Sequence, residues 1–395
     1  MIDRTKVWTG DLNERTVDTT PFESIGRIGL YDSTLRDGEQ TVGVALGPEI
    51  KLRIAKALDE LGVDRIEAGF PMVSAGDAEA YELILDAGLR AEIWGFSRAL
   101  RGDVDQLVSL GVRHAVIESP VSDGKLAAYG MTREKVTERI TDAVSYAAEA
   151  GINVCFFGVD GTRADLDFLA EIYGASIEAG AKEVAIVDTL GIAAPEAAAF
   201  LVRSCREWVG PDVPIHWHGH NDFGLATACN LEAVKAGATW IQGTINGMGE
   251  RAGNANLGEF ALALEAIYHG TTNLNFGKLV EVAHLVQELS GYELEPWKVA
   301  TGENLFRRES GAVASQFHDP PAVEPYSSEL VNATRGIVLG KKSGLASINI
   351  KLDELGLEFP ENRRGDLLEA VKEIGSSERR LVSDDEFRGL VKQMS

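Results

Sequence analysis

The stretch Arg133–Phe157, REKVTERITDAVSYAAEAGINVCFF, contains the structural unit that is repeated along most of this chain. Its first part has apolar residues at the three- and four-residue spacing of one helix face, which predicts a helix over Arg133–Ala150. Gly151 follows, and glycine is the residue most often found just after a helix end. The short apolar run Asn153–Phe157 comes next and indicates a buried β-strand. Helix, glycine and strand in this order indicate an α/β protein.

The same order recurs on both sides of this stretch. Further helices are predicted over Glu49–Leu61, Ala164–Ala179 and Pro195–Trp208, and several helices end in Ala-Gly or Leu-Gly before the next strand. Eight such units in about 245 residues predict a (β/α)8 TIM barrel. A doubly wound sheet is the alternative, but it would place a GxGxxG turn after the first strand, and that motif is absent there. The predicted strands are Ile28–Asp32, Arg65–Ala68, Ala91–Phe96, His114–Glu118, Asn153–Phe157, Glu183–Asp188, Val213–His218 and Thr239–Ile245.

The barrel is expected to occupy residues 26–270 of the 395-residue chain. Residues 1–25 form a polar N-terminal lead-in. The repeating pattern stops after Gly270, so residues 271–395 are expected to form a linker and small C-terminal helical subdomains. Helices are predicted there over Leu274–Leu289 and Asp384–Lys392.

Composition narrows the class of partner. The formal net charge is −23, which argues against a nucleic acid or an anionic membrane surface as the partner. No apolar run approaches the length of a membrane span, and no apolar signal core is present at the N-terminus. The chain has only 3 cysteines and none with CxxC spacing, which predicts a reducing, cytoplasmic location and no cysteine-based zinc site.

The stretch His216–Asp222, HWHGHND, carries the first indication of function. It begins within the seventh predicted strand, Val213–His218, and alternate side chains of a strand point to the same face. His216, His218 and His220 therefore share a face, and imidazoles so placed can bind one cation. The chain is a candidate metalloenzyme.

Polar side chains concentrate where predicted strands end, which is the working face of a TIM barrel. Asp37 follows the first strand and completes a carboxylate and imidazole set that leaves metal positions open for substrate. Such a metal would polarise the carbonyl of a 2-oxo acid, while Arg36 would neutralise the developing oxyanion and Thr189 would bind a carboxylate. For Arg251, a structural salt bridge with a neighbour such as Glu250 is at least as good an explanation as catalysis.

Five motifs in a fixed order identify a resemblance: DSTLRDGEQ, IEAGFP, DTLG, HGHNDFGLA and INGMGERAGNANL. Together they closely resemble the isopropylmalate, homocitrate and citramalate synthases, the acyl-CoA condensing branch of the DRE-TIM metallolyase family. The resemblance runs from about Gly29 to Leu264, and it resumes weakly at LGKKSG, residues 339–344.

The resemblance implies a site and a reaction. Asp37, His218 and His220 would bind a divalent metal (Mg, Mn, Zn or Co), with Asn254 as a weaker ligand and His216 one pleat deeper in the barrel. A base would remove a methyl proton from acetyl-CoA, and the enolate would attack the metal-bound 2-oxo acid. Hydrolysis of the thioester would then release CoA. The family also implies a homodimer with a swapped linker subdomain.

Two departures from the family pattern affect proton transfer. Val159 stands where the family has a glutamate, although Asp160 and Arg163 of that loop remain. Val313 stands where the family has a catalytic histidine supplied by the other subunit. An aliphatic side chain cannot transfer a proton, so the usual relay must be altered.

Other residues are candidates for the missing roles. His318 and Tyr326 are candidate acid/base groups, with an exposed loop histidine as the equal alternative for His318. Asp160 is also a candidate catalytic residue, as are Glu39 and Gln40, which close the first motif. Arg163, Arg307 and Arg308 are candidate binders of an anionic substrate group. The strand-4 loop also departs from the His-bearing family form and reads ESPVSD, residues 118–123.

Three functions follow from these observations. The first is a Claisen-type condensation of an acyl-CoA, expected to be acetyl-CoA, with a 2-oxo acid. The second, prompted by the missing Glu and His, is a metal-dependent aldolase or lyase that acts without CoA. The third is a non-catalytic metal-binding relative. No C-terminal leucine-sensing domain is expected.

Overall fold

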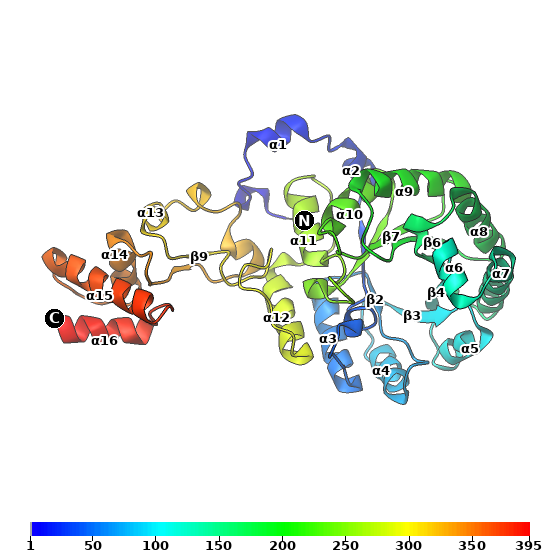
Figure 1. Cartoon of the computed structure of the whole chain (residues 1–395), viewed down its shortest axis with the longest axis horizontal. Coiled ribbons are helices and arrows are strands. Elements are labelled where there is room, and N and C mark those ends of the chain that lie inside the picture. The colour runs from blue at the N-terminus through cyan, green and yellow to red at the C-terminus, as the bar shows by residue number, and fades with distance from the viewer. Residues whose placement is uncertain (1) are drawn as a thin grey trace. The chain divides into compact units, whose positions relative to one another are not determined.

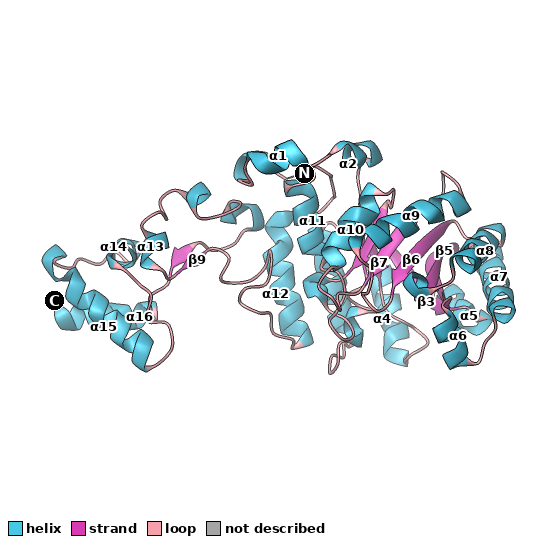
Figure 2. Ribbon diagram, turned by 45° about the horizontal axis from the view of Figure 1, so that its top comes forward, coloured by secondary structure: helices cyan, strands magenta, loops and turns pink. Residues whose placement is uncertain are grey.

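The computed structural model describes residues 2–395, which form two compact units. The first comprises Ile2 and Asn13–Leu294, and the second comprises Asp3–Leu12 and Glu295–Ser395. In the first unit, eight parallel strands close into a barrel in sequence order (Figures 1 and 2). The strands are β1 Gly29–Asp32, β2 Arg65–Glu67, β3 Glu92–Arg98, β4 His114–Pro120, β5 Asn153–Val159, β6 Glu183–Asp188, β7 Ile215–Gly219 and β8 Trp240–Gly243. The predicted (β/α)8 barrel is confirmed.

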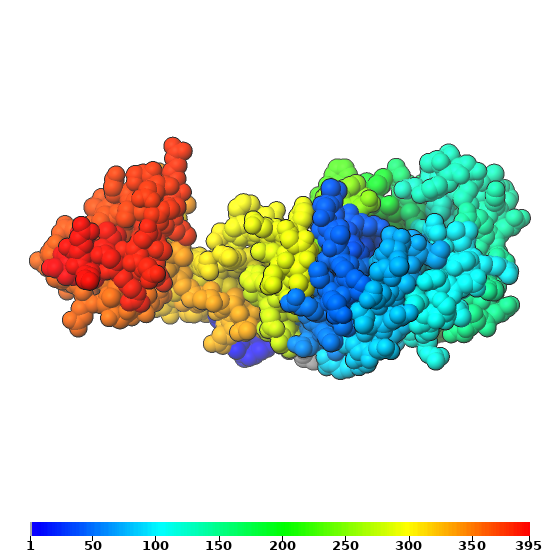
Figure 3. Space-filling view, turned by 90° about the horizontal axis from the view of Figure 1, so that it is seen from below, coloured from blue at the N-terminus to red at the C-terminus, as the bar shows by residue number. Residues whose placement is uncertain are grey.

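Helices follow the strands and cover the outside of the barrel (Figure 1). In the space-filling view of Figure 3, consecutive segments of this unit lie side by side, from dark blue to cyan. The helices of the first unit are α1 Asp11–Thr16 (which begins in the second unit), α2 Thr20–Ile25, α3 Pro48–Leu61, α4 Ala75–Asp86, α5 Arg101–Ser109, α6 Asp123–Tyr129, α7 Arg133–Glu149, α8 Leu166–Glu178, α9 Pro195–Val209, α10 Ala226–Lys235, α11 Leu257–Ala266 and α12 Leu279–Ser290.

Each predicted strand overlaps an observed one, and the differences lie at the ends. The seventh strand begins at Ile215 rather than Val213, in keeping with Pro214, which has no backbone N–H to donate to a ladder. The third continues to Arg98, beyond the predicted Phe96, because its last residues pair with Ile117 and Glu118 of β4. Register with a neighbouring strand is a tertiary property that periodicity does not report.

The barrel interior combines aromatic side chains with buried cations. Tyr31, Trp94, Phe96 and Phe157 belong to the apolar cluster inside the strands. Arg65 enters from β2 and lies over the Trp240 ring, with its guanidinium carbon 3.5 Å from the ring centroid. The interior is therefore packed rather than open, and substrate access is restricted to the ends of the strands.

The first unit extends past the expected boundary at residue 270. Helix α12 packs against α3, which keeps residues up to Leu294 with the barrel. The expected lead-in of residues 1–25 is also divided, because Trp8 N–H donates to Pro325 O at 2.8 Å and joins its segment to the second unit. Both differences come from long-range packing, which the local composition of the sequence does not encode.

The second unit contains, within its described residues, a two-stranded parallel sheet and four complete α-helices. Its core includes Ile348, Leu367, Val371 and Phe387, all fully buried. The elements are β9 Arg307–Arg308, β10 Gly336–Ile337, α13 Gly311–Ala314, α14 Leu345–Glu354, α15 Arg364–Ser377 and α16 Asp384–Met394.

Among residues 2–395, none of the helices combines the length and the apolar character needed to span a membrane.

Candidate metal centre and active site

Three buried side chains from the two ends of the barrel sequence meet at the carboxyl ends of the strands. Asp37 lies in the turn after β1, His218 lies near the end of β7, and His220 follows that strand directly. His218 Nε2 is 3.3 Å and His220 Nε2 is 3.7 Å from Asp37 Oδ2. One ligand atom from each of the three residues lies within 4.8 Å of the others. This is the size of a site that holds one metal ion.

Unpartnered polar atoms support the same assignment. Asp37 Oδ1, His220 Nδ1 and Asn254 Oδ1 are buried and have no hydrogen-bond partner among the described residues. Buried polar atoms are normally paired, and each such exception calls for an explanation. The Asn254 amide nitrogen donates to Met248 O at 3.0 Å, which leaves its oxygen as the unused group. A carboxylate, two imidazoles and an amide oxygen fit a divalent cation.

The position of Asn254 depends on a glycine. Gly253 has φ of +81°, and a Cβ there would lie 1.9 Å from Gly247 O. Asn254 N–H donates to Gly247 O at 3.1 Å, and Asn254 forms an antiparallel bridge with His220. Only glycine fits this close approach, which keeps Asn254 beside the histidine.

Arg36 joins the candidate metal centre to a carboxylate that sequence reasoning did not single out. Arg36 Nε donates to Glu67 Oε2 at 2.7 Å, while Nη1 lies 3.3 Å from Asp37 Oδ2. The guanidinium carbon is 4.3 Å from the centroid of Phe96, and Nη2 is buried without a partner. The signal for Glu67 in the sequence is its place in the IEAGFP motif, at the end of the predicted strand Arg65–Ala68, and the structure shows that β2 is fully buried.

Burial and the nearby charges shift the pKa values of these groups in opposite directions. Burial raises the pKa of Glu67, and the Arg36 ion pair only partly offsets this. Burial also disfavours ionised Asp37, but Arg36, His218 and His220 together outweigh it and hold the pKa of Asp37 well below its usual range. Burial lowers the pKa of His220 to about 4. At neutral pH, His220 is therefore an uncharged imidazole, the form that binds metals.

The depressed pKa of His220 predicts a loss of stability in acid for the metal-free protein. The unfolded imidazole binds a proton near pH 6.5, whereas the folded one does so only near pH 4. The unfolded state therefore binds more protons in this window, and the free energy of unfolding falls as the pH falls. We expect a loss of about 2 kcal/mol between pH 7 and pH 5 from this group.

Urea unfolding of the metal-free protein at both pH values measures this loss. The matched control is His220→Gln, which removes the titrating group and should reduce the pH dependence by the same amount. An equal pH dependence in the wild type and this variant would contradict the prediction.

The loop after β5 is held by its own ion pair. Asp160 is fully buried at φ of +66° and forms an ion pair with Arg163, whose Nη2 is 2.6 Å from Asp160 Oδ2. Ser122 Oγ donates a hydrogen bond to the same carboxylate, and Asp160 N–H donates to Thr189 Oγ1 at 2.8 Å. In this arrangement Asp160 is fully hydrogen-bonded and is not a free base.

Both carboxylate oxygens of Glu39 also have protein partners. Its Oε2 lies 2.6 Å from Nζ of the buried Lys51, and its Oε1 accepts from Leu46 N–H at 2.6 Å. Gln40 is exposed. These contacts shape the turn after β1.

Arg251 donates to Asp222 at 2.9 Å and to Thr189 O at 2.6 Å. It therefore forms a structural salt bridge, the alternative to a catalytic role, and its main partner is Asp222 rather than Glu250.

The remaining candidates belong to the second unit. His318 is exposed, and Val313 lies in α13. Tyr326 packs against Phe306 with 5.6 Å between ring centroids, and burial raises its pKa to about 12.

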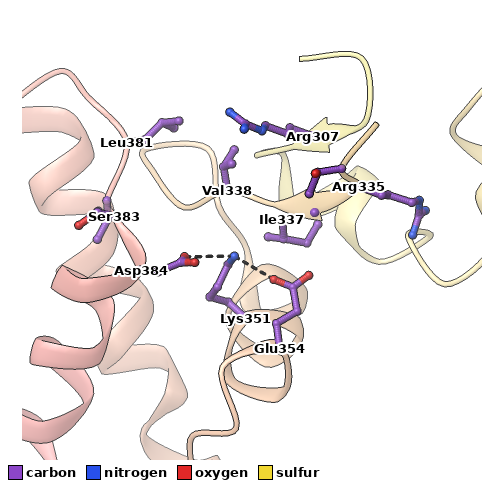
Figure 4. A pocket seen from close by; sticks show the side chains of 12 residues that line it. Arg307, Arg335, Ile337, Val338, Lys351, Glu354, Leu381, Ser383 and Asp384 are labelled. Carbon is purple, nitrogen blue, oxygen red and sulfur yellow. Dashed lines mark ion pairs between the residues drawn. The ribbon is translucent and has the colours of Figure 1, made fainter. Parts of the chain in front are cut away.

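The candidate anion-binding arginines have protein partners in this unit. Arg308 donates to four backbone carbonyls, and Arg307 pairs with Glu303 at 2.8 Å. Arg307 also lines a cavity of about 400 Å³, in which Lys351 lies between Glu354 and Asp384 (Figure 4). Because carboxylates already neutralise these cations, the cavity has no marked preference for an anion.

A smaller cavity of about 140 Å³ opens at the carboxyl ends of β3, β4 and β5. Arg98, Glu118 and Arg139 contribute its charged groups. Burial raises the pKa of Glu118, and the charge of Arg36 has the strongest opposing effect. The cavity therefore lies on the same face of the barrel as the Asp37 cluster.

Solved structures show the fold alone. The HMG-CoA lyase from Brucella melitensis matches with a TM-score of 0.60 and 18% identity, covering 67% of this chain and 99% of that chain.

Curated relatives are far more similar in sequence. A homocitrate synthase AksA from Methanopyrus kandleri is 43% identical over 92% of both chains. A 2-isopropylmalate synthase from Methanocaldococcus jannaschii is 40% identical over 91% of this chain and 70% of its own length. Relatives with different substrate names are thus nearly equally similar, so overall identity does not select the 2-oxo acid.

A family model described as HMGL-like matches residues 27–286. This match covers the whole barrel, including Asp37, His218 and His220, in agreement with the resemblance seen in the sequence. The chain therefore belongs to the HMGL-like family.

Proposed function

We propose that this protein is a divalent-metal-dependent synthase that condenses acetyl-CoA with a 2-oxo acid and releases free CoA. The observation that carries the proposal is the convergence of Asp37, His218 and His220 beside the buried Arg36. The names of the relatives, a homocitrate synthase and a 2-isopropylmalate synthase, support the same reaction class.

The chain's own residues would divide the work. Asp37, His218, His220 and Asn254 would hold the metal, which when bound supplies a Lewis acid for the 2-oxo carbonyl. Arg36 would donate from its unpartnered Nη2 to the oxygen on which negative charge develops. The neighbouring cavity of about 140 Å³ would receive the remainder of the 2-oxo acid.

Proton abstraction is assigned to the second unit. Within the barrel, the carboxylates of Glu39, Glu67 and Asp160 are each held in an ion pair, so none of them is free to contact a substrate proton in this arrangement. The proposal therefore retains Tyr326 and His318 as the acid/base groups, acting in a homodimer with a swapped linker. Tyr326→Phe and His318→Gln should each lower turnover without loss of metal if this assignment holds.

The test is a thiol-release assay on protein stripped of metal and reloaded separately with Mg²⁺, Mn²⁺, Zn²⁺ or Co²⁺. Acetyl-CoA is supplied with 2-oxo acids that differ in size and in the presence of a second carboxylate. We expect CoA release that depends on both the metal and one 2-oxo acid. Release that is equal without any 2-oxo acid, or no release with any member of the panel, would refute the proposal.

A lyase or aldolase that acts without CoA is the second candidate. Val159 and Val313, in place of the expected glutamate and histidine, favour it because they remove parts of the condensing relay. The same reloaded protein, given 3-hydroxy acids or 4-hydroxy-2-oxo acids, would then release a 2-oxo acid.

A further inference from the structure

A continuous row of polar side chains runs beneath the candidate metal centre through the interior of the barrel. It starts at Glu183 on β6, passes through His216 on β7 and Gln242 on β8, and ends at His218. All four side chains are buried. The proposed function uses only His218, so the other three require their own explanation.

Glu183 determines which group donates and which accepts in each hydrogen bond of the row. Its carboxylate accepts from Arg65, with Oε2 2.6 Å from Nη1 and Oε1 3.1 Å from Nη2. An ionised carboxylate can only accept hydrogen bonds. His216 Nε2 lies 2.6 Å from Glu183 Oε2, so this nitrogen carries a proton and donates it.

The next contact follows from the first. A neutral imidazole that donates through Nε2 accepts through Nδ1. A second proton on His216 is disfavoured first by the complete burial of the ring, and also by the Arg65 guanidinium, which lies 3.4 Å from the ring at Nε2. Gln242 Nε2 lies 3.1 Å from His216 Nδ1, so the amide nitrogen donates to it.

Gln242 then has only its oxygen for His218. Gln242 Oε1 lies 3.1 Å from His218 Nδ1, so this nitrogen must carry the proton. The lone pair of His218 is consequently on Nε2, which faces Asp37 Oδ2 at 3.3 Å. Two acceptors face each other across this gap, an arrangement that a cation between them would satisfy.

We propose that Gln242 and His216, anchored by the Arg65–Glu183 ion pair, are positioning residues that hold His218 in the tautomer whose Nε2 is free for the metal. This rests on the metal site of the proposed function, but not on the reaction. Hydrogen-bond partners of metal-binding histidines set ring orientation and tautomer, and their loss typically weakens metal affinity about 10- to 100-fold.

The test compares affinities of folded, metal-free variants for Mn²⁺ and Zn²⁺ alone, by calorimetry or chelator competition. Gln242→Met keeps the side-chain volume but cannot accept from His218, and we expect binding about 10- to 100-fold weaker. Gln242→Glu still accepts from His218 Nδ1 and should restore affinity to near that of the wild type. Asn230→Leu, which removes a different buried amide on α10, is the matched control and should leave affinity unchanged.

Long-range ¹H–¹⁵N spectra of ¹⁵N-histidine-labelled, metal-free protein report the tautomers directly. We expect the proton on Nδ1 of His218 and on Nε2 of His216 in the wild type. A wild-type His218 protonated on Nε2 would overturn the proposal, as would wild-type affinity in Gln242→Met or no recovery in Gln242→Glu. These measurements use no substrate, so they test the positioning of His218 even if the condensation assay fails.

Discussion

Replacing Asp37 by alanine is expected to weaken divalent-metal binding by more than about 100-fold, beyond the usual effect of losing a ligand's hydrogen-bond partner. Asp37 is the only carboxylate in the buried cluster with His218 and His220 among the described residues. Its removal leaves two neutral imidazoles beside the Arg36 cation, which repels a divalent ion. Metal content by elemental analysis after dialysis, with condensation activity in parallel, measures the effect.

Asp64→Asn is the matched control for this substitution. Asp64 also pairs with an arginine, Arg27, but it lies just before β2 at the opposite end of the barrel. This variant should lose some stability and keep its metal. Stoichiometric metal in Asp37→Ala would refute the ligand assignment.

Replacing Arg36 by methionine should lower the free energy of unfolding by about 3 to 5 kcal/mol, because one partner of a buried ion pair is lost. Glu67 has no solvent exposure, and its carboxylate would remain without the guanidinium that neutralises it. Activity should fall by a further factor of about 100 to 1,000, the usual effect of removing one donor to a developing oxyanion. Urea unfolding and steady-state rates of metal-loaded protein measure the two effects.

A double variant separates stability from catalysis. Adding Glu67→Gln to Arg36→Met removes the uncompensated charge, so most of the lost stability should return. Activity should not return, because the donor is still absent. Recovery of both properties together would show that Arg36 acts only by supporting the fold.

The sequence predicted the barrel and its working face well because both have local signals. Each helix has apolar residues on one face, and glycines such as Gly151 and Gly180 follow the helix ends at positive φ. The ends of the strands can also be recognised from the local sequence. The turn after β1 and the HWHGHND stretch could therefore be assigned to one end of the barrel. The placement of Asp37 with His218 and His220 follows from that rule.

The partners of these residues were not predictable in the same way. Glu67, Glu183 and Gln242 come from three different strands, and the sequence does not show which side chain each of them contacts. Their roles depend on the register between strands, which decides whether a side chain reaches Arg36, His216 or His218. The same holds for Glu39 and Asp160, whose pairing with Lys51 and Arg163 depends on how their loops fold.

By itself, the sequence determined that this chain forms a (β/α)8 barrel with carboxylate and imidazole groups at one end, because helix periodicity and strand alternation are short-range properties. Only the tertiary structure decided how those groups are charged and oriented. Burial, the Arg36 ion pairs and the row from Glu183 to His218 set proton positions through contacts between residues distant in the chain. Such contacts exist only once the barrel has closed.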